Sequence, residues 1–542
     1  MMSYSFDESC DEDAILHIMR GLLRQIREIV ASAPPEVLLD YIYRRYMDGL
    51  VSNDVSDGMS RELVKDLIID VQLLLECVHA SFCATLPQGY VELTEEQGDK
   101  LFKIIQRLRQ AALQYAMLSS MDEDDEDRAR IKYLSLCKWF FIRGKRYQKL
   151  EEEFLHYVLL PHNESLKQTY GLEGREIARE WQKAIDNYAL PEEAIEILTN
   201  YFKHNDFKYS KEIGNNGVQE EISIDEEYSL DIESAIDDLF YRGSANILKH
   251  TRLPVTLLED LAFERGSDTS FFDEGQYAGT LCNTLPIRKK PLVKLNNGYY
   301  IIDIYLFRDV FYRALLHGLV RRNEGNEKYK EIFKVKQQNM SEDAFVDILS
   351  SHLKGAEIYK GFYYKENADW VENDVLILID DVLFLIEAKS GSEASIVSPA
   401  VNFDRHVRSI KDLIIRAYYQ CKRFLSYLDS ADQVPIYQLV NGRYVEQKII
   451  RKSDYRQVFP IGLTVESLAP FSTYCKHLGE IEPLQGGYGF ISMSIDDLFV
   501  LRKCLPSLGE FVHYLSVRQG LESIKNSRFI DEFDYLGGIP KT

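Results

Sequence analysis

The sequence predicts a multidomain protein, with an α-helical N-terminal part and an α/β part in its C-terminal half. Three observations carry this prediction. The chain has 542 residues, more than one hydrophobic core usually organises. Residues 12–205 repeat apolar side chains at helical spacing. From residue 328 the pattern changes to helix, three strands, helix and strand.

The N-terminal part reads as a series of amphipathic helices. Thr94 followed by Gln97 has the spacing of a capping box and marks one helix start. Residues 205–227 are polar and are expected to form a linker or loop. Helices are expected over residues 14–31, 35–50, 61–82, 94–118, 128–143, 147–160, 175–188 and 191–204. The expected organisation is a helical domain (1–205), a mixed α/β connecting region (206–327), an α/β domain (328–465) and a C-terminal cap packed on it (466–542).

The α/β domain is expected to begin with a helix over residues 342–353, capped by Ser341. Glu342 lies at the head of its core-facing stripe, which suits either a site at the edge of the core or a favourable charge at a helix N-terminus. Strands are expected at 357–364, 375–379, 382–386, 458–464 and 490–493, and helices at 303–322, 409–428, 494–504 and 508–521.

Residues 373–391, NDVLILIDDVLFLIEAKSG, are the most informative stretch. Two apolar β-type runs flank the pair Asp380-Asp381, which predicts a hairpin. With those two residues as the turn, Asp374 lies opposite Glu387. Because side chains alternate along a strand, Lys389 then shares their face, at the open end of the hairpin.

Two facing carboxylates repel each other unless a cation or a shared proton lies between them. Mg²⁺ prefers carboxylate oxygens and usually keeps several waters. A lysine beside such a metal could orient or activate a water, and this arrangement would suit a hydrolytic centre for phosphodiesters. The alternative is an exposed hairpin end with a surface Glu–Lys pair.

The helix at 409–428 separates into an apolar stripe and a basic face that carries Lys411, Arg416, Lys422 and Arg423, with Gln420 at the boundary. Residues 401–456 hold eleven Lys and Arg against six Asp and Glu, in a chain with a formal net charge of −22. Such a local basic area predicts contact with a nucleic-acid backbone. A solvated amphipathic helix is the alternative.

Composition excludes several classes of protein. The net charge of −22 argues against a generic nucleic-acid-coating protein. The eight cysteines form no CxxC pair and no metal-ligand spacing, so reduced, mostly buried thiols are expected. The acidic N-terminus does not read as a secretory signal, and the longest apolar run, 375–386, is broken by two Asp. We expect a cytoplasmic protein without a membrane span.

Glu342 on a helix, then Asp374, then Glu387-Ala388-Lys389, then a helix with Gln420, resembles the PD-(D/E)xK superfamily of restriction-endonuclease-like nucleases. The resemblance covers residues 328–464, about a quarter of the chain. Asn373 stands where the family usually has Pro. The resemblance implies a restriction-endonuclease-like core, which is a mixed central sheet flanked by helices.

The resemblance also implies roles for residues. Asp374 and Glu387, with the carbonyl of Ala388, would ligate Mg²⁺ or Mn²⁺, and Lys389 would position or deprotonate the attacking water. Glu342 would support the metal site, and Gln420 would touch the nucleic-acid backbone or steady the site.

The expected activity is metal-dependent phosphodiester hydrolysis, of DNA more than RNA. A role in prokaryotic genome defence follows by analogy of fold alone. The alternative is a catalytically silent nuclease-fold scaffold that recruits a protein partner through the helical N-terminal domain, which could equally form an oligomer.

Overall fold

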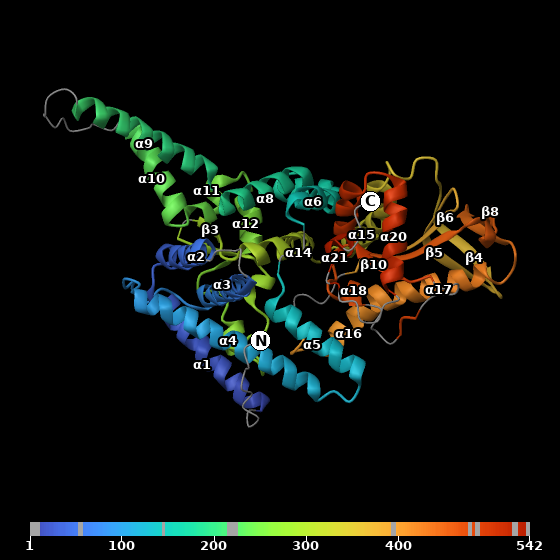
Figure 1. The fold of residues 1–542 in the computed structure, drawn as a ribbon, viewed down its shortest axis with the longest axis horizontal. Coiled ribbons are helices and arrows are strands. Elements are labelled where there is room, and N and C mark those ends of the chain that lie inside the picture. Colours follow the sequence, from blue (N-terminus) through green and yellow to red (C-terminus); the bar gives the residue numbers. More distant parts are fainter. Residues whose placement is uncertain are drawn as a thin grey trace. The chain divides into compact units, whose positions relative to one another are not determined.

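The computed structural model describes residues 11–52, 58–143, 147–213, 226–296, 298–391, 397–474, 480–482, 488–522, 529 and 531–537. The chain divides into two compact units, and neither is continuous in sequence. The first comprises Met1–Ser119, Phe140–Gly144 and Leu166–Arg322; the second comprises Ser120–Trp139, Lys145–Ser165 and Asn323–Thr542. The helical N-terminal part and the α/β part expected from the sequence are both present (Figure 1).

The first unit is mainly helical. Its small sheet has the order β1-β2-β3, with β1 and β2 parallel and β2 and β3 antiparallel. The Thr94–Gln97 capping box is confirmed, because each residue's side chain bonds the other's backbone N–H. Elements mostly of this unit are α1 (Glu12–Ser32), α2 (Pro35–Ser52), α3 (Gly58–Ala84), α4 (Glu95–Met121), α7 (Asn163–Tyr170), α8 (Gly174–Ala189), α9 (Glu192–Ile213), α10 (Glu226–Phe240), η3 (Gly243–Ala245), α11 (Ile247–His250), α12 (Val255–Leu261), β1 (Ala262–Glu264), α13 (Ser270–Asp273), η4 (Pro286–Arg288), β2 (Leu292–Leu295), β3 (Gly298–Ile301) and α14 (Ile304–Arg322).

Two segments of this unit concern the expected linker and the expected absence of a membrane span. Residues 205–213 of the expected linker are helical, because α9 continues to Ile213, and 214–225 lie outside the described residues. Within α3, Val64–Ala84 is long and apolar enough to cross a membrane by length and composition, and 72% of the tested stretch is buried inside the protein. The core helix of a soluble protein passes the same test.

The second unit is built on a mixed seven-stranded sheet with the order β10-β9-β6-β5-β4-β7-β8. β10, β9 and β6 are mutually parallel, and the remaining neighbours are antiparallel. Its elements are α5 (Glu126–Phe141), η1 (Gln148–Leu150), α6 (Glu151–Leu159), η2 (Leu160–His162), α15 (Glu327–Ile348), β4 (Glu357–Glu366), β5 (Asp369–Ile379), β6 (Val382–Lys389), α16 (Phe403–Ile410), η5 (Lys411–Ile415), α17 (Arg416–Leu428), β7 (Val434–Val440), β8 (Arg443–Ile450), η6 (Lys452–Asp454), β9 (Gln457–Thr464), α18 (Phe471–Tyr474), β10 (Ile491–Ser494), α19 (Ile495–Cys504), α20 (Leu508–Glu522) and α21 (Glu532–Gly537).

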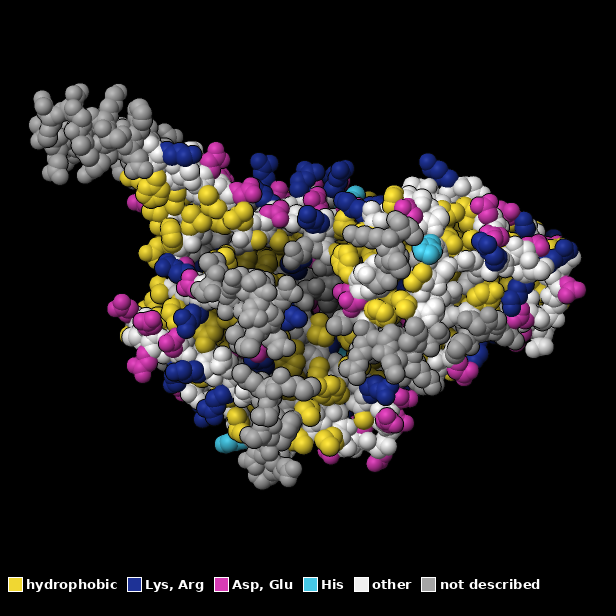
Figure 2. Space-filling view, viewed as in Figure 1, with side chains coloured by type: hydrophobic (Ala, Val, Ile, Leu, Met, Phe, Trp, Pro, Cys, Tyr) yellow, Lys and Arg dark blue, Asp and Glu magenta, His cyan; other side chains and the backbone are white. Residues whose placement is uncertain are grey.

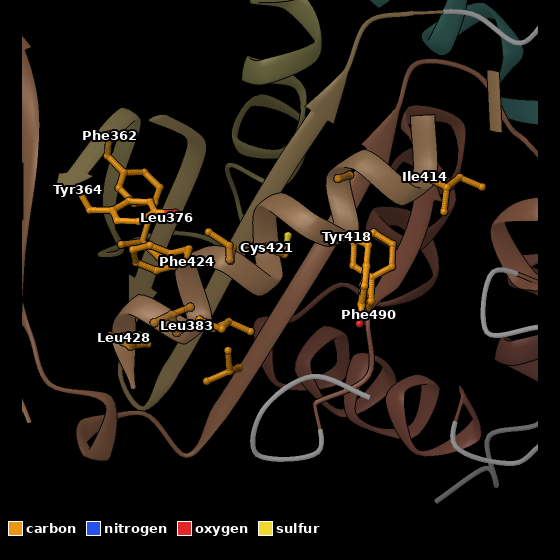
Figure 3. Close-up of a cluster of buried hydrophobic side chains, with 14 of the residues drawn as sticks. Phe362, Tyr364, Leu376, Leu383, Ile414, Tyr418, Cys421, Phe424, Leu428 and Phe490 are labelled. Atoms are coloured by element: carbon orange, nitrogen blue, oxygen red, sulfur yellow. The ribbon is translucent and has the colours of Figure 1, made fainter. Parts of the chain in front are cut away.

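Helices cover both faces of this sheet. On one face α17 lays its apolar stripe on β4, β5 and β6, and the side chains of Phe362, Tyr364, Leu376 and Leu383 meet those of Cys421 and Phe424 (Figure 3). The rings of Phe362 and Phe424 lie edge to face at 5.0 Å. On the other face Phe345 of α15 and Phe511 of α20 pack on Phe384 of β6.

The start predicted for the helix at 342–353 is wrong. α15 begins at Glu327, where the side chain of Asn326 accepts a hydrogen bond from the N–H of Tyr329. Ser341 is therefore no N-cap; its hydroxyl lies inside the helix and donates to the carbonyl of Gln338 at 2.8 Å. No Gly or Pro interrupts residues 327–348, so nothing stops the helix before Ser341.

Three further strands, β7, β8 and β10, belong to the same sheet. Residues 434–450, expected only to belong to a basic region, form the hairpin β7–β8 at the sheet edge. Residues 466–542, expected as a cap, supply β10 to the same sheet and α20 to its face.

Candidate active site

The predicted hairpin register is confirmed. β5 and β6 pair from Ile379 opposite Val382 through to Val375 opposite Ile386. The tight turn requires a left-handed residue, and Asp380 has φ 49°. The ladder ends at the Val375 pair, so the next two residues, Asp374 and Glu387, lie where the strands begin to part.

Beyond the Val375–Ile386 pair, hydrogen bonds from backbone to side chain take the place of the backbone hydrogen bonds between β5 and β6. Oδ2 of Asp374 accepts a hydrogen bond from the N–H of Ala388 at 2.7 Å, and Oε1 of Glu387 accepts from the N–H of Asp374 at 3.4 Å. The ammonium of Lys389 lies 3.8 Å from Oδ2 of Asp374 and 3.4 Å from Oε2 of Glu387. The structure therefore brings together the two carboxylates and the lysine that the sequence singled out.

The site is largely withdrawn from solvent. The side chain of Glu387 is fully buried, and those of Asp374 and Lys389 are 17% and 15% exposed. Burial raises the pKa of Asp374, against the opposing effect of Lys389. Burial, and then the charge of Asp374, raises the pKa of Glu387 well above its usual range. Without a cation, this pair of carboxyls favours holding a proton.

Asn373 also belongs to this site, although its place in the sequence does not predict it. Its side chain is completely buried, and its amide nitrogen donates to Oε1 of Glu387. Its side-chain oxygen has no hydrogen-bond partner and is one of the buried, unpaired polar atoms among the described residues. A buried polar atom without a partner is costly, so this oxygen is available to a ligand or water.

An irregularity in the neighbouring strand explains why Asn373 points into the site. Tyr359 and Phe362 of β4 both face the core beneath α17, although strict alternation would place them on opposite faces. Gly361, between them, has φ +56°, and the β4–β5 pairing is interrupted there, between the Lys360–Val375 and Phe362–Asn373 pairs. The alternation slips here, and Asn373, which pairs with Phe362, turns toward the face of Glu387.

Glu342 lies in electrostatic reach of this site. Its pKa is raised by burial first and then by the charges of Asp374 and Glu372, while Gln338 Nε2 donates to its Oε1 at 2.8 Å. Because α15 begins at Glu327, Glu342 lies well inside the helix, and a favourable charge at a helix N-terminus no longer explains it. Of the two explanations for an acidic residue at this position, proximity to the site at Asp374 is the one that remains.

On α17, Cys421 rather than Gln420 is the residue linked to the carboxylates. Cys421 is fully buried, and burial followed by the charge of Glu387 raises the pKa of its thiol. Gln420 is half-buried at the edge of the helix face, as predicted, and no hydrogen bond connects it to Asp374 or Glu387 in the described part of the chain.

The predicted basic face of the helix is exposed but internally paired. Lys411 bonds Glu480 at 3.0 Å, and Arg416 lies 3.7 Å from Asp412. Arg423 bonds Glu366 at 2.5 Å, and Lys422 lies 3.8 Å from Glu482. Figure 2 shows Lys and Arg interspersed with Asp and Glu over the surface, without one broad basic area on this side. Exposed ion pairs contribute roughly 0–1 kcal/mol each, so phosphates could displace them.

The donor set fits a hard divalent cation. Two carboxylates, the carbonyl of Ala388 and the unpaired oxygen of Asn373 are all oxygen donors, the type that Mg²⁺ and Mn²⁺ prefer. Among the described residues no three Asp, Glu, His or Cys side chains gather closely enough to hold a metal ion. A bound Mg²⁺ would therefore keep several waters, as it usually does.

Comparison of the chain with protein-family models, with curated proteins and with solved structures finds no match. The geometry of the site is thus the basis on which its function is inferred.

Proposed function

We propose that the chain is a metal-dependent nuclease that hydrolyses phosphodiester bonds, with DNA as the expected substrate. One observation carries the proposal: at the parted end of a buried hairpin, the Lys389 ammonium lies within 4 Å of a carboxylate oxygen of both Asp374 and Glu387. Burying a pair of carboxylates destabilises a fold, and groups with such shifted pKa values cluster at functional sites. The resemblance to the PD-(D/E)xK nucleases, and with it a restriction-endonuclease-like core, belongs to this proposal.

Each residue has a role in the proposed chemistry. Asp374 and Glu387, with the carbonyl of Ala388, would hold Mg²⁺ or Mn²⁺, which offsets charge on the phosphate oxygens and the leaving group. The Lys389 ammonium already donates to the Ala388 carbonyl at 3.3 Å, so it lies at the same edge of the site and can orient an attacking water. Glu342 would support the site from α15. Lys411, Arg416, Gln420, Lys422 and Arg423 would contact the nucleic-acid backbone.

The test is cleavage of circular and linear DNA and RNA by purified protein with Mg²⁺, Mn²⁺ or EDTA. We expect cleavage that needs the metal and is abolished in Asp374→Ala, Glu387→Gln and Lys389→Ala. Glu331→Gln is the matched control, since Glu331 is an exposed carboxylate on α15. Cleavage that survives EDTA, or a fully active Glu387→Gln variant, would contradict the mechanism. Loss of circular DNA would establish internal cutting.

A second candidate is a nuclease-fold module that binds a partner without hydrolysis. The observation that favours it is the pairing of all four basic side chains of the predicted nucleic-acid face with acidic neighbours. Nucleic-acid binding without turnover in either metal would support this candidate over the first. Two further proposals have the same standing: a cytoplasmic location, from the scattered cysteines and the acidic N-terminus, and a role in prokaryotic genome defence, from analogy of fold.

A further inference from the structure

The edge of the large sheet carries a cluster of four aromatic rings from four strands. Trp370 of β5 stacks on Tyr444 of β8, with ring centroids 3.8 Å apart and planes 14° from parallel. Tyr437 of β7 meets the indole edge to face at 4.9 Å, and Tyr363 of β4 meets Tyr444 at 5.2 Å. All four side chains are half-buried, so each keeps some access to solvent.

This aromatic platform (Tyr363, Trp370, Tyr437 and Tyr444) lies on the sheet face opposite α17. Phe362 and Tyr364 point into the core beneath α17, so Tyr363 between them points the other way. Tyr363 pairs with Tyr437, which places Tyr437 on the same face.

Among the described residues, no aromatic contact joins the platform to α15 or α20. On the platform's face, the aromatic contacts of α15 and α20 fall on Phe384 of β6, not on the edge strands. At the edge Leu439, Val445 and Ile449 are each more than 40% exposed. Figure 1 shows the end of the sheet labelled β4 and β8 extending beyond these helices.

A cation without a counter-ion accompanies the rings. Lys365 pairs with Trp370 across the β4–β5 ladder and therefore shares its face. Its ammonium lies 5.9 Å from the centroid of the indole. Lys365 is exposed, and among the described residues it has no ion pair, unlike the four basic side chains on the α17 side.

The platform is connected to the carboxylates along β5. Trp370 precedes Asp374 by four residues, a distance of about 13 Å along a strand. Glu372 lies between them, opposite Tyr363, and its charge contributes to the raised pKa of Glu342. Glu387 itself is on the α17 face, so a strand lying on the platform's face would meet the site from its Asp374 side, where Glu342 of α15 is within electrostatic reach of both Asp374 and Glu372. A few nucleotides of an extended strand span this distance.

We propose that the aromatic platform stacks unpaired nucleobases, with Lys365 on a neighbouring phosphate, so that a single-stranded nucleic acid or a single-stranded end is delivered to the Asp374–Glu387 site. Base faces are hidden inside a duplex, whereas a platform of stacked aromatic side chains with a free cation is the chemistry that binds single strands without regard to sequence. The delivery of the strand to a cleavage site rests on the proposed nuclease function. The binding of single strands to the platform can be measured without any cleavage.

The alternative is that the rings only stabilise the strand edge as cross-strand pairs. Tryptophan fluorescence separates the two. The chain has three tryptophans, and Trp139 and Trp181 are buried, so Trp370 is the one that a ligand can reach. A stacked base should quench its emission, whereas a purely structural ring would report no ligand.

The experiment uses the full-length Glu387→Gln protein in EDTA, which removes cleavage from the measurement. Fluorescein-labelled oligothymidylate and oligouridylate of about 12 nucleotides, and a DNA duplex of equal length, are titrated by anisotropy alongside tryptophan emission. We expect the single strands to bind at least about tenfold more tightly than the duplex and to quench the emission. Trp370→Leu should weaken single-strand binding by about tenfold to a hundredfold and remove the quenching.

Companion variants keep the test decisive. Trp370→Phe retains a ring and should retain more of the binding than Trp370→Leu, and Lys365→Gln should weaken binding and reduce its salt dependence. Tyr241→Leu, at an exposed ring outside the second unit, should bind as the parent does. Equal thermal midpoints show that the variants fold, and Tyr444→Leu replaces Trp370→Leu if they do not.

Single-strand binding that Trp370→Leu leaves unchanged, or a preference for duplex without quenching, would overturn the inference even if the wild-type protein cleaves. Quenching and binding without cleavage in Mg²⁺ or Mn²⁺ would instead support the platform and contradict the proposed nuclease activity. Comparison of the affinities for oligothymidylate and oligouridylate shows whether the platform prefers DNA or RNA.

Discussion

The side-chain amide of Asn373 donates a hydrogen bond to Oε1 of Glu387, and both side chains are completely buried. Oε1 also accepts from the backbone N–H of Asp374, so two donors fix one oxygen of Glu387. The other oxygen, Oε2, lies 3.4 Å from Lys389. Asn373 thus orients the carboxylate on which the proposed metal site depends.

Asn373→Ala should leave Oε1 without its side-chain donor and allow Glu387 to rotate. Residues that orient metal ligands typically contribute 10–100-fold in metal affinity or activity, and we expect a loss of about that size in Mn²⁺ affinity. Isothermal titration with Mn²⁺ measures it. Asn373→Ser, which keeps a shorter donor, should recover part of the loss. An unchanged Mn²⁺ affinity in Asn373→Ala would show that Asn373 only fills space.

Metal affinity should increase with pH. In the metal-free protein, burial and Asp374 raise the pKa of Glu387, so at neutral pH a proton competes for the site. As pH rises from the usual carboxyl range through this raised pKa, the proton is lost and the apparent Kd for Mn²⁺ should fall, by up to about tenfold per pH unit. Above the raised pKa the affinity should level off.

Glu387→Gln is the control for this pH dependence. The amide cannot titrate, so its weaker Mn²⁺ affinity should vary less with pH than that of the wild-type protein. The measurement is a series of Mn²⁺ titrations at constant ionic strength, since salt screens exposed charges more than this buried pair. A wild-type affinity that is flat with pH would contradict the assignment of the proton to these carboxyls.

The register of the β5–β6 hairpin was predictable because alternation and a two-residue turn fix which residues face each other. The same kind of signal is present for β7–β8. Asn441-Gly442, with φ 50° and 76°, is a favoured hairpin turn between two β-type runs. Without that hairpin, the rings of Tyr437 and Tyr444 could not be placed beside Trp370.

The role of Asn373 could not be predicted from the sequence. Strict alternation assigns it to the face opposite Asp374, and only the slip at Gly361 turns it toward Glu387. The start of α15 was misplaced for a different reason. Ser341 suits an N-cap in isolation, but the continuous helix from Glu327 satisfies the same backbone groups without it.

Asp303 in the first unit should make the protein less stable as pH rises. It is fully buried, and burial, followed by the charge of Glu76, raises its pKa from 3.8 to about 8. Between pH 3.8 and about pH 8 the folded chain holds the proton and the unfolded chain has released it. The contribution of Asp303 to the free energy of unfolding is therefore complete below pH 3.8 and is lost as pH rises toward 8.

Asp303→Asn removes this titration while keeping an oxygen that can accept from the N–H of Tyr305, as Asp303 does at 2.9 Å. We expect the urea midpoint of the wild-type protein to fall from pH 6 to about pH 8, and that of Asp303→Asn to fall less. Parallel pH dependence in the two proteins would show that Asp303 is ionised in the fold.

Glu342→Gln tests whether α15 supports the proposed catalytic centre. Glu342 is half-buried, and the charges of Asp374 and Glu372 add to burial in raising its pKa, so it lies near the site. Its observed hydrogen bond is to Gln338, not to Asp374 or Glu387, so an indirect contribution is expected. The cleavage rate in Mg²⁺ should fall about 10–100-fold, the range for residues that act through a metal ligand, whereas Glu387→Gln should show none. Glu331→Gln on the same helix should cleave normally, and a Glu342→Gln rate equal to that control would remove Glu342 from the site.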